Sequence, residues 1–257
     1  MTGMRPVKTI NERIDALLGD GSFLKSHASL YLKNNHHRKR LTALLDTTVK
    51  YGPETILEIG GSDGLLAKLI MLELGGKVKK YYFAELDGTN LSYARKNLSS
   101  DNVEFLKFDV CKDDIGQRGL DLIICSEVLE HVLDYEKALH NIIGAMSERV
   151  IVSTPNERFL AGFAKNVFRK FRRRENIPSG FLARCLFGMD MSGHKRETAG
   201  GCYPSHAGFD NLKFERNLRA ISSEHYGIRK VAIGPRGFRM CHIYELHKRP
   251  ACRLTRA

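Results

Sequence analysis

The chain has 257 residues, 42% of them hydrophobic, which is enough to bury the core of a complete α/β domain. It has no apolar stretch long enough to cross a bilayer and no apolar signal segment, and its six cysteines lack paired spacing, so we expect a cytoplasmic protein with reduced thiols. The net charge of +12 is uneven: residues 1–156 hold 20 Lys and Arg against 21 Asp and Glu, and residues 157–257 hold 21 against 8. The basic part is therefore expected to serve a substrate or an anionic surface.

Two helices are expected in the first 50 residues. The apolar residues of segment 10–18 recur at helical spacing and predict a short helix. Residues 24–45 predict a longer, partly basic helix. This second helix contains adjacent histidines, His36 and His37, which could bind a metal or act as an acid or base, but a solvated helix face is the preferred interpretation.

The most informative stretch is an apolar strand that ends in an acid and a glycine-rich bend, residues 56–64. Glycines let main-chain N–H groups approach a ligand closely, and a helical pattern follows the bend. A dinucleotide fingerprint needs its third glycine five positions after the first, where this chain has Leu65. The compressed pattern Glu58-x-Gly60-x-x-x-Gly64 instead resembles motif I of the class I S-adenosylmethionine-dependent methyltransferases.

This resemblance implies S-adenosylmethionine as the cofactor and a Rossmann-like fold. That fold is an α/β, mostly parallel seven-stranded sheet with helices on both faces and an antiparallel last strand; the alternation of strands and helices predicts the same class independently. Ser62 stands where the family usually has glycine. The implied cofactor-binding residues are Glu58, Gly60, Gly61, Ser62, Gly64, Glu85, Leu86, Asp109, Val110 and Ser126.

Acids follow the next two predicted strands. The strand at 81–87 contains Glu85, whose carboxylate is expected to accept hydrogen bonds from both ribose hydroxyls. Asp87 is the competing candidate, but it precedes a helical pattern and is better explained as an N-cap. A third strand is predicted at 103–110, and its Asp109 resembles the residue that receives the adenine amino group in the family.

The fourth strand, predicted at 120–126, is followed by a candidate catalytic group. Glu127, Glu130 and His131 have the spacing of one helix face, and two carboxylates with an imidazole suit Mg or another divalent metal. This pattern resembles the metal site of small-RNA 2′-O-methyltransferases and of ubiquinone-pathway O-methyltransferases. The likeness implies His206 as a further ligand, with His194 in reserve.

The alternative keeps the same residues without a metal. Many methyltransferases of this group carry a similar sequence and use it to line the pocket. Glu130 and His131 would then simply line the pocket. They are also the candidate catalytic residues, with His131 as a general base that takes a proton from the acceptor without a metal.

A basic amphipathic segment at 157–174 follows the fifth strand, which is predicted at 150–154. Aromatic residues recur every four positions, and lysines and arginines fill the remaining face. Such a helix can lie on an anionic membrane, as the insertion of the ubiquinone-pathway enzymes does, which would make the protein peripheral at the membrane. It can equally be a cover helix that packs on the sheet.

Four regions follow from these patterns: an N-terminal helical cover at 1–50, a cofactor-binding core at 51–156, a basic substrate region at 157–215, and a closing hairpin at 216–257 with strands at 228–233 and 240–246. The preferred function is O-methylation of a small, lipid-linked or glycan-like acceptor. An RNA 2′-O-methyltransferase with a divalent metal is the first alternative, and a non-catalytic cofactor-binding module is the second.

Overall fold

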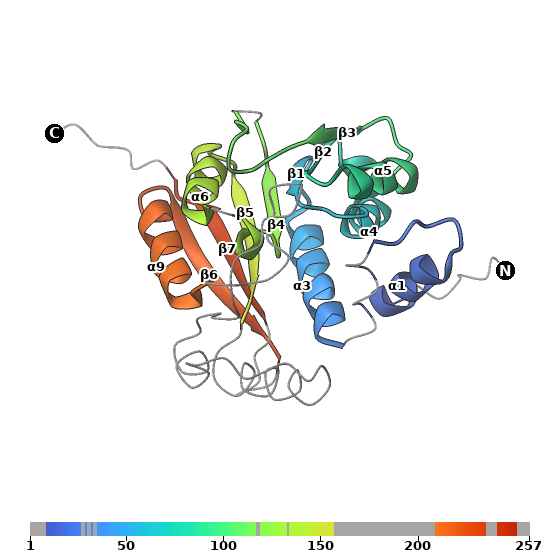
Figure 1. The fold of residues 1–257 in the computed structure, drawn as a ribbon, viewed down its shortest axis with the longest axis horizontal. Helices are drawn as coiled ribbons and strands as arrows, with labels where there is room; N and C mark the ends of the chain where they lie inside the picture. Colours follow the sequence, from blue (N-terminus) through green and yellow to red (C-terminus); the bar gives the residue numbers. More distant parts are fainter. Residues whose placement is uncertain are drawn as a thin grey trace. The chain divides into compact units, whose positions relative to one another are not determined.

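The computed structural model describes residues 9–26, 29, 32, 35–116, 119–132, 134–156, 209–234 and 241–250. The chain divides into two compact units, residues 1–108 and 109–257. The strands are β1 (Thr55–Ile59), β2 (Lys80–Glu85), β3 (Val103–Lys107), β4 (Leu122–Ser126), β5 (Arg149–Pro155), β6 (Tyr226–Ile233) and β7 (Cys241–Lys248). The α-helices are α1 (Ile10–Gly19), α3 (Asn35–Tyr51), α4 (Leu65–Leu74), α5 (Gly88–Asn97), α6 (Tyr135–Gly144) and α9 (Asn211–Ser222), and Figure 1 labels these elements.

The strands form a seven-stranded sheet in the order β3-β2-β1-β4-β5-β7-β6. The pairs β1–β2, β2–β3 and β4–β5 are parallel. β7 pairs antiparallel with both of its neighbours, β5 and β6. The predicted α/β class, with a mostly parallel sheet and an antiparallel last strand, is confirmed.

The first unit contains the parallel strands β1, β2 and β3. β1 is buried without interruption from Ile56 to Ile59, and Tyr81 and Phe83 of β2 are fully buried, as expected where helices cover both faces of a parallel sheet. Helix α3 packs against α4, and α5 packs against β2 and β3. The crossover helices α4 and α5 begin directly after β1 and β2, so the loops between strand and helix lie at the carboxyl ends of the strands.

The predicted helix at 24–45 is wrong at its start. Leu24 and Ser26 are not helical, and α3 begins only at Asn35. The cause is a set of hydrogen bonds that hold the main chain of these residues elsewhere: the Leu24 amide donates to Asn97 Oδ1 (2.9 Å) and the Ser26 amide to Asp63 Oδ2 (2.7 Å). The short helix predicted at 10–18 is confirmed as α1.

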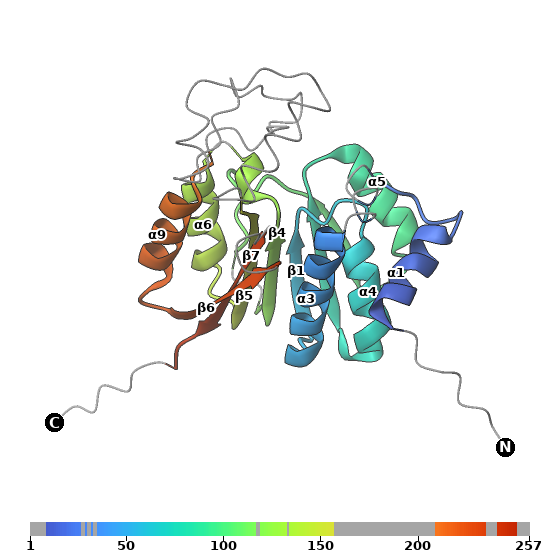
Figure 2. The ribbon, with the colours of Figure 1, turned by 90° about the horizontal axis from the view of Figure 1, so that it is seen from below.

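In the second unit, α6 and α9 lie side by side in both Figure 1 and Figure 2. Aromatic rings join them to the sheet. The Phe214 ring lies 5.7 Å from the Tyr135 ring of α6 and 5.7 Å from the Tyr244 ring of β7. These contacts bury the apolar face of α9 between a helix and the C-terminal hairpin β6–β7.

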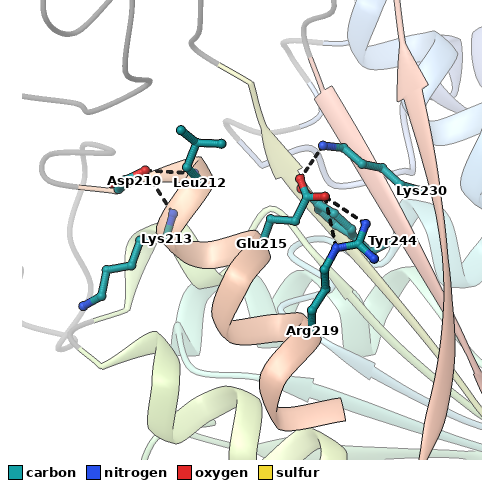
Figure 3. Close-up of polar contacts among 7 residues, drawn as sticks. All are labelled: Asp210, Leu212, Lys213, Glu215, Arg219, Lys230 and Tyr244. Carbon is teal, nitrogen blue, oxygen red and sulfur yellow. Dashed lines mark hydrogen bonds and ion pairs between the residues drawn. The ribbon is translucent and has the colours of Figure 1, made fainter. Parts of the chain in front are cut away.

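Polar contacts fix both the start of α9 and its link to the C-terminal hairpin (Figure 3). The Asp210 carboxylate caps the helix by accepting from the amides of Leu212 (2.8 Å) and Lys213 (3.1 Å). One turn later, Glu215 Oε2 accepts from Lys230 of β6 (2.5 Å), and Glu215 Oε1 accepts from Arg219 (2.9 Å). These cations outweigh partial burial and lower the pKa of Glu215. Glu215 therefore connects α9 to the hairpin.

The amphipathic segment predicted at 157–174 lies outside the described residues, so its membrane and cover-helix interpretations both stay predictions. No helix in the described part of the chain is long and apolar enough to cross a membrane.

Candidate functional site

The first candidate region is the glycine bend, Gly60 to Gly64, which joins β1 to α4. Gly60 and Gly64 have φ values of 71° and 82°, in the left-handed region that L side chains rarely adopt. Ser62 also has a positive φ, 56°. The bend turns tightly because the Gly64 amide donates to the Gly61 carbonyl (3.0 Å). Its conformation therefore depends on glycine at both ends and on a strained serine in the middle.

Glu85, at the end of β2, is hydrogen-bonded to this bend. One carboxylate oxygen accepts from the Ser62 amide (2.9 Å), and the other accepts from the Asp87 amide (2.9 Å). The residue is only 8% exposed, and burial raises its pKa, although these amide bonds act in the opposite direction. The two amides fix the position of the carboxylate beside the bend.

The Asp87 side chain has a different structural role from that of Glu85. It is the N-cap of α5 and accepts from the Asn90 amide (2.8 Å), as predicted. Its side chain is exposed, whereas Glu85 is buried. The two neighbouring acids are therefore distinct in position: Glu85 contacts the bend and Asp87 caps a helix. Leu86 lies half-buried between them.

Glu58, at the end of β1, is buried rather than presented to solvent. It is 4% exposed, and the Tyr81 hydroxyl donates to its Oε2 (2.6 Å). Burial raises the pKa of Glu58 to about 7. Gly61 lies against it, since a Cβ there would be 2.3 Å from the Phe83 ring and 3.0 Å from the Glu58 carboxyl carbon. Packing alone thus requires glycine at position 61.

Asp63 is the residue of the bend whose side chain the sequence patterns missed. It is 2% exposed, and its Oδ2 accepts from the Ser26 amide (2.7 Å) and from the Ser29 hydroxyl. Its Oδ1 accepts from the Leu65 amide at the start of α4 (3.3 Å). The only local signal is an aspartate one residue before Gly64, the N-cap of α4, and that position does not reveal a long-range contact.

Three predicted cofactor residues belong to the second unit: Asp109, Val110 and Ser126. Asp109 Oδ1 accepts from the Cys111 amide (2.9 Å), and Oδ2 pairs with Lys112 (2.8 Å). Partial burial acts to raise the pKa of Asp109, but the hydrogen bonds and charge of these partners lower it overall. Val110 is buried, and the Ser126 hydroxyl lies 2.8 Å from that of Ser153 on β5. The predicted contact of Asp109 with adenine stays a prediction.

The predicted helix face for Glu127, Glu130 and His131 is wrong. Glu127 has a φ of 56°, which cannot continue a right-handed helix, and its amide donates to the Ser153 carbonyl of β5 (3.0 Å). A helical turn begins only at Leu129, as the three-residue 3₁₀ helix η3 (Leu129–His131). Glu130 is buried at 4% exposure and His131 is half-buried. Two of the three residues therefore share a turn, and Glu127 belongs to the strand end.

The Glu127 side chain extends toward the C-terminal hairpin, where the Cys241 thiol donates to its Oε1 over 3.7 Å. Within the residues the structure describes, there is no group of three or more His, Cys, Asp or Glu arranged to hold a metal ion. The remaining predicted ligand, His206, and its reserve, His194, lie outside those residues. The divalent metal therefore stays a prediction.

A model of the methyltransferase domain matches residues 32–204 of this chain, which is more than half of its length. The chain belongs to the methyltransferase domain family. The match includes the glycine bend and Glu85, and it confirms the methyltransferase resemblance at the level of the family. It does not distinguish the ubiquinone-pathway type from others.

The chain is also similar to curated methyltransferases. It is 26% identical over 105 residues to uncharacterized methyltransferases of Mycobacterium tuberculosis and Mycobacterium bovis, and the alignment covers 41% of this chain. The aligned residues span about half the length of these relatives, 51%.

Solved methyltransferase structures share the fold. The methyltransferase domain of bacterial CtHen1 has a TM-score of 0.57 at 16% identity, with 84% of this chain and 100% of that chain covered. The N-methyltransferase NodS of Bradyrhizobium japonicum WM9, in complex with S-adenosylhomocysteine, has a TM-score of 0.55 at 14% identity, with 93% and 98% covered. Magnesium protoporphyrin IX methyltransferase from Synechocystis PCC 6803 has a TM-score of 0.57 at 15% identity, with 93% and 94% covered.

Proposed function

We propose that this protein is an S-adenosylmethionine-dependent methyltransferase whose glycine bend and Glu85 bind the cofactor. The observation that carries the proposal is the Glu85 carboxylate, held by the amides of Ser62 and Asp87. An ionised carboxylate has about four acceptor positions, so about two remain for the ribose hydroxyls after these amides have bound. The family match supports the same activity.

The bound cofactor would supply an electrophilic methyl group, and this chain would position it. Gly60 and Gly64 have left-handed backbone, and glycine at such a bend lets main-chain N–H groups approach a ligand without an intervening Cβ. Holding the two reactants in line can supply much of the acceleration in such a transfer. The contribution of the first unit is therefore binding and orientation.

For a hydroxyl acceptor we propose His131 or Glu130 as the group that removes the proton. Both lie in η3, directly after the fourth strand. An imidazole titrates near neutrality and is well suited to accept a proton at physiological pH. A divalent metal held by Glu127, Glu130, His131 and His206 is the alternative means of activating the hydroxyl.

We further propose that the acceptor is small and lipid-linked or glycan-like and is methylated on oxygen. Support comes from the likeness to ubiquinone-pathway enzymes and from the basic segment 157–174, which suits an anionic membrane surface and a cytoplasmic, peripheral location. RNA 2′-O-methylation is the second candidate. It is favoured by the charge of residues 157–257, 21 Lys and Arg against 8 Asp and Glu, and by the fold shared with a chain of the Pnkp1/Rnl/Hen1 RNA repair complex.

One experiment separates these acceptors. Purified protein is incubated with methyl-labelled S-adenosylmethionine and, separately, with lipid, glycan and RNA fractions of the host. Label in the lipid or glycan fraction supports the preferred function, whereas label in RNA, together with RNA binding that weakens steeply with added salt, supports the second. Binding of cofactor without transfer to any fraction would identify a non-catalytic module.

A further inference from the structure

The glycine bend is tied to a part of the chain far away in sequence. Asp63 accepts hydrogen bonds from Ser26 and Ser29, which lie 37 and 34 residues earlier. The Ser26 hydroxyl lies 2.8 Å from the Ser62 hydroxyl. Ser26, Ser29 and Asp63 are all less than 7% exposed, so these bonds are shielded from water. We call Leu24, Ser26 and Ser29 the N-terminal tie.

Asn97, near the end of α5, completes the connection. Its Oδ1 accepts from the Leu24 amide (2.9 Å), and its Nδ2 donates both to the Leu24 carbonyl (2.8 Å) and to the Asp63 carbonyl (2.8 Å). The side chain is buried at 6% exposure. The main chain of Asp63 and that of Leu24 are thus held by the same amide group.

These bonds act on the strained part of the bend. Ser62 keeps a positive φ of 56°, which costs free energy in a non-glycine residue. Its hydroxyl is held by Ser26 and its amide by Glu85. Asp63, the next residue, is held by the N-terminal tie and by Asn97. Loss of the Asp63 carboxylate would release the bend toward unstrained conformations and move the Ser62 amide away from Glu85.

We propose that Asp63 is a positioning residue that couples the N-terminal tie to the glycine bend, so that the tie and the cofactor stabilise each other. The inference rests on the proposed function, because it takes the bend as the cofactor site. Asp63 acts through Ser62 and Glu85. Coupling of this kind is reciprocal: if the tie strengthens cofactor binding, the bound cofactor must strengthen the tie by the same factor.

The test measures both directions of this coupling with S-adenosylhomocysteine as the probe. Calorimetry gives its affinity, and hydrogen exchange of residues 22–29 with and without the probe reports the tie. In the wild-type protein the probe should slow exchange of this segment. Asp63→Ala should weaken binding by about tenfold or more and abolish the slowing. If Asp63 has a purely structural role, the probe should leave the exchange of this segment unchanged even in the wild-type protein.

Asp20→Ala is the matched control. Asp20 also accepts from a serine amide and hydroxyl, both of Ser22 and both at 2.8 Å, but within its own exposed turn. It should bind the probe as the wild type does. Ser29→Ala and Ser26→Ala remove one hydroxyl each and serve if Asp63→Ala does not fold; each should weaken binding by a smaller factor.

Two failures are distinguishable. Wild-type protein that does not bind S-adenosylhomocysteine would overturn the proposed function and this inference together. Wild-type binding that is unchanged in Asp63→Ala and in both serine variants would overturn the coupling alone and leave the cofactor site in place.

Discussion

The glycine bend of the first unit and the turn after β4 in the second unit share one feature and differ in another. Each contains a non-glycine residue with a φ of 56°, Ser62 in the bend and Glu127 in the turn. Ser62 is held by Glu85 through its amide and by Ser26 through its hydroxyl, both within 3 Å. Glu127 is held through its amide by Ser153 at 3.0 Å, and its side chain accepts from a thiol at 3.7 Å.

The residues proposed for the two halves of the reaction are therefore held in different ways. On the cofactor side, the bend and Glu85 are fixed by buried hydrogen bonds within the first unit. The acceptor side depends on residues spread over the second unit and beyond the described residues, since His206 and segment 157–174 are both expected to contribute. Under the proposed function, the bend is preorganised for the cofactor, and the turn supplies chemical groups whose role the acceptor determines.

The largest expected effect concerns the turn. If His131 is a general base, His131→Ala should lower the rate of methyl transfer by a factor of about 10² to 10⁴, while a chelator leaves the rate unchanged. If a divalent metal activates the acceptor, the chelator should stop transfer and leave S-adenosylhomocysteine binding intact.

The pH profile separates the cases further: a His base gives a plateau above its pKa, whereas a metal-bound hydroxyl gives a rate that rises with its ionisation. A rate of methyl transfer that changes neither with the chelator nor in His131→Ala would show that the turn only lines the pocket.

The buried acid behind the bend should make stability depend on pH. Burial raises the pKa of Glu58 to about 7, above its ordinary 4.5, so the folded state favours the neutral form. Its contribution is therefore fully present below about pH 4.5 and is lost as pH rises through about 7. A shift of this size corresponds to about 3 kcal/mol. Denaturant unfolding at pH 5 and pH 8 should show this loss in the wild type and not in Glu58→Gln.

Glu54→Gln provides the control for that measurement, because Glu54 is an exposed glutamate just before the same strand. It should keep the pH dependence of the wild type. Identical pH dependence in wild type and Glu58→Gln would show that Glu58 is not the titrating group.

Features that depend on residues close together in the sequence could be predicted, and features that depend on contacts between distant residues could not. The bend, the first five strands and the Asp87 cap follow from local patterns of glycine, apolar residues and acids, and all were predicted. The start of α3 and the role of Asp63 were missed because they depend on bonds between residues 34 or more positions apart. The helix face at Glu127 was wrong because the spacing of residues does not reveal a left-handed backbone.

An effect similar in total size to that of Glu58 is expected for the basic segment of the acceptor side. If residues 157–174 lie on an anionic membrane, replacing Arg172, Arg173 and Arg174 with Gln should weaken binding to anionic vesicles by about 1 kcal/mol per charge. Co-sedimentation measures the change, and the same variant with neutral vesicles is the control. Unchanged binding would favour the cover-helix interpretation.

The smallest effect concerns the connection between α9 and the hairpin. Glu215→Gln removes the charge that pairs with Lys230 and Arg219, and its side chain is only 21% exposed. It should lower the free energy of unfolding by about 1 kcal/mol, less at high salt. Lys213→Gln, which breaks the more exposed pair with Glu136, should have a smaller effect still. The reverse order would mean that the Glu215 contacts do not stabilise the second unit.

The proposed role of Glu85 as the ribose ligand is tested most directly by calorimetric titration of S-adenosylhomocysteine into wild type, Glu85→Ala and Asp87→Ala. Asp87→Ala keeps its main-chain amide, so the bond that holds Glu85 survives and only the cap of α5 is lost. We expect the affinity to be lowered by about tenfold or more in Glu85→Ala and to stay close to that of the wild type in Asp87→Ala. A larger loss in Asp87→Ala than in Glu85→Ala would contradict the assignment of Glu85 as the ribose ligand.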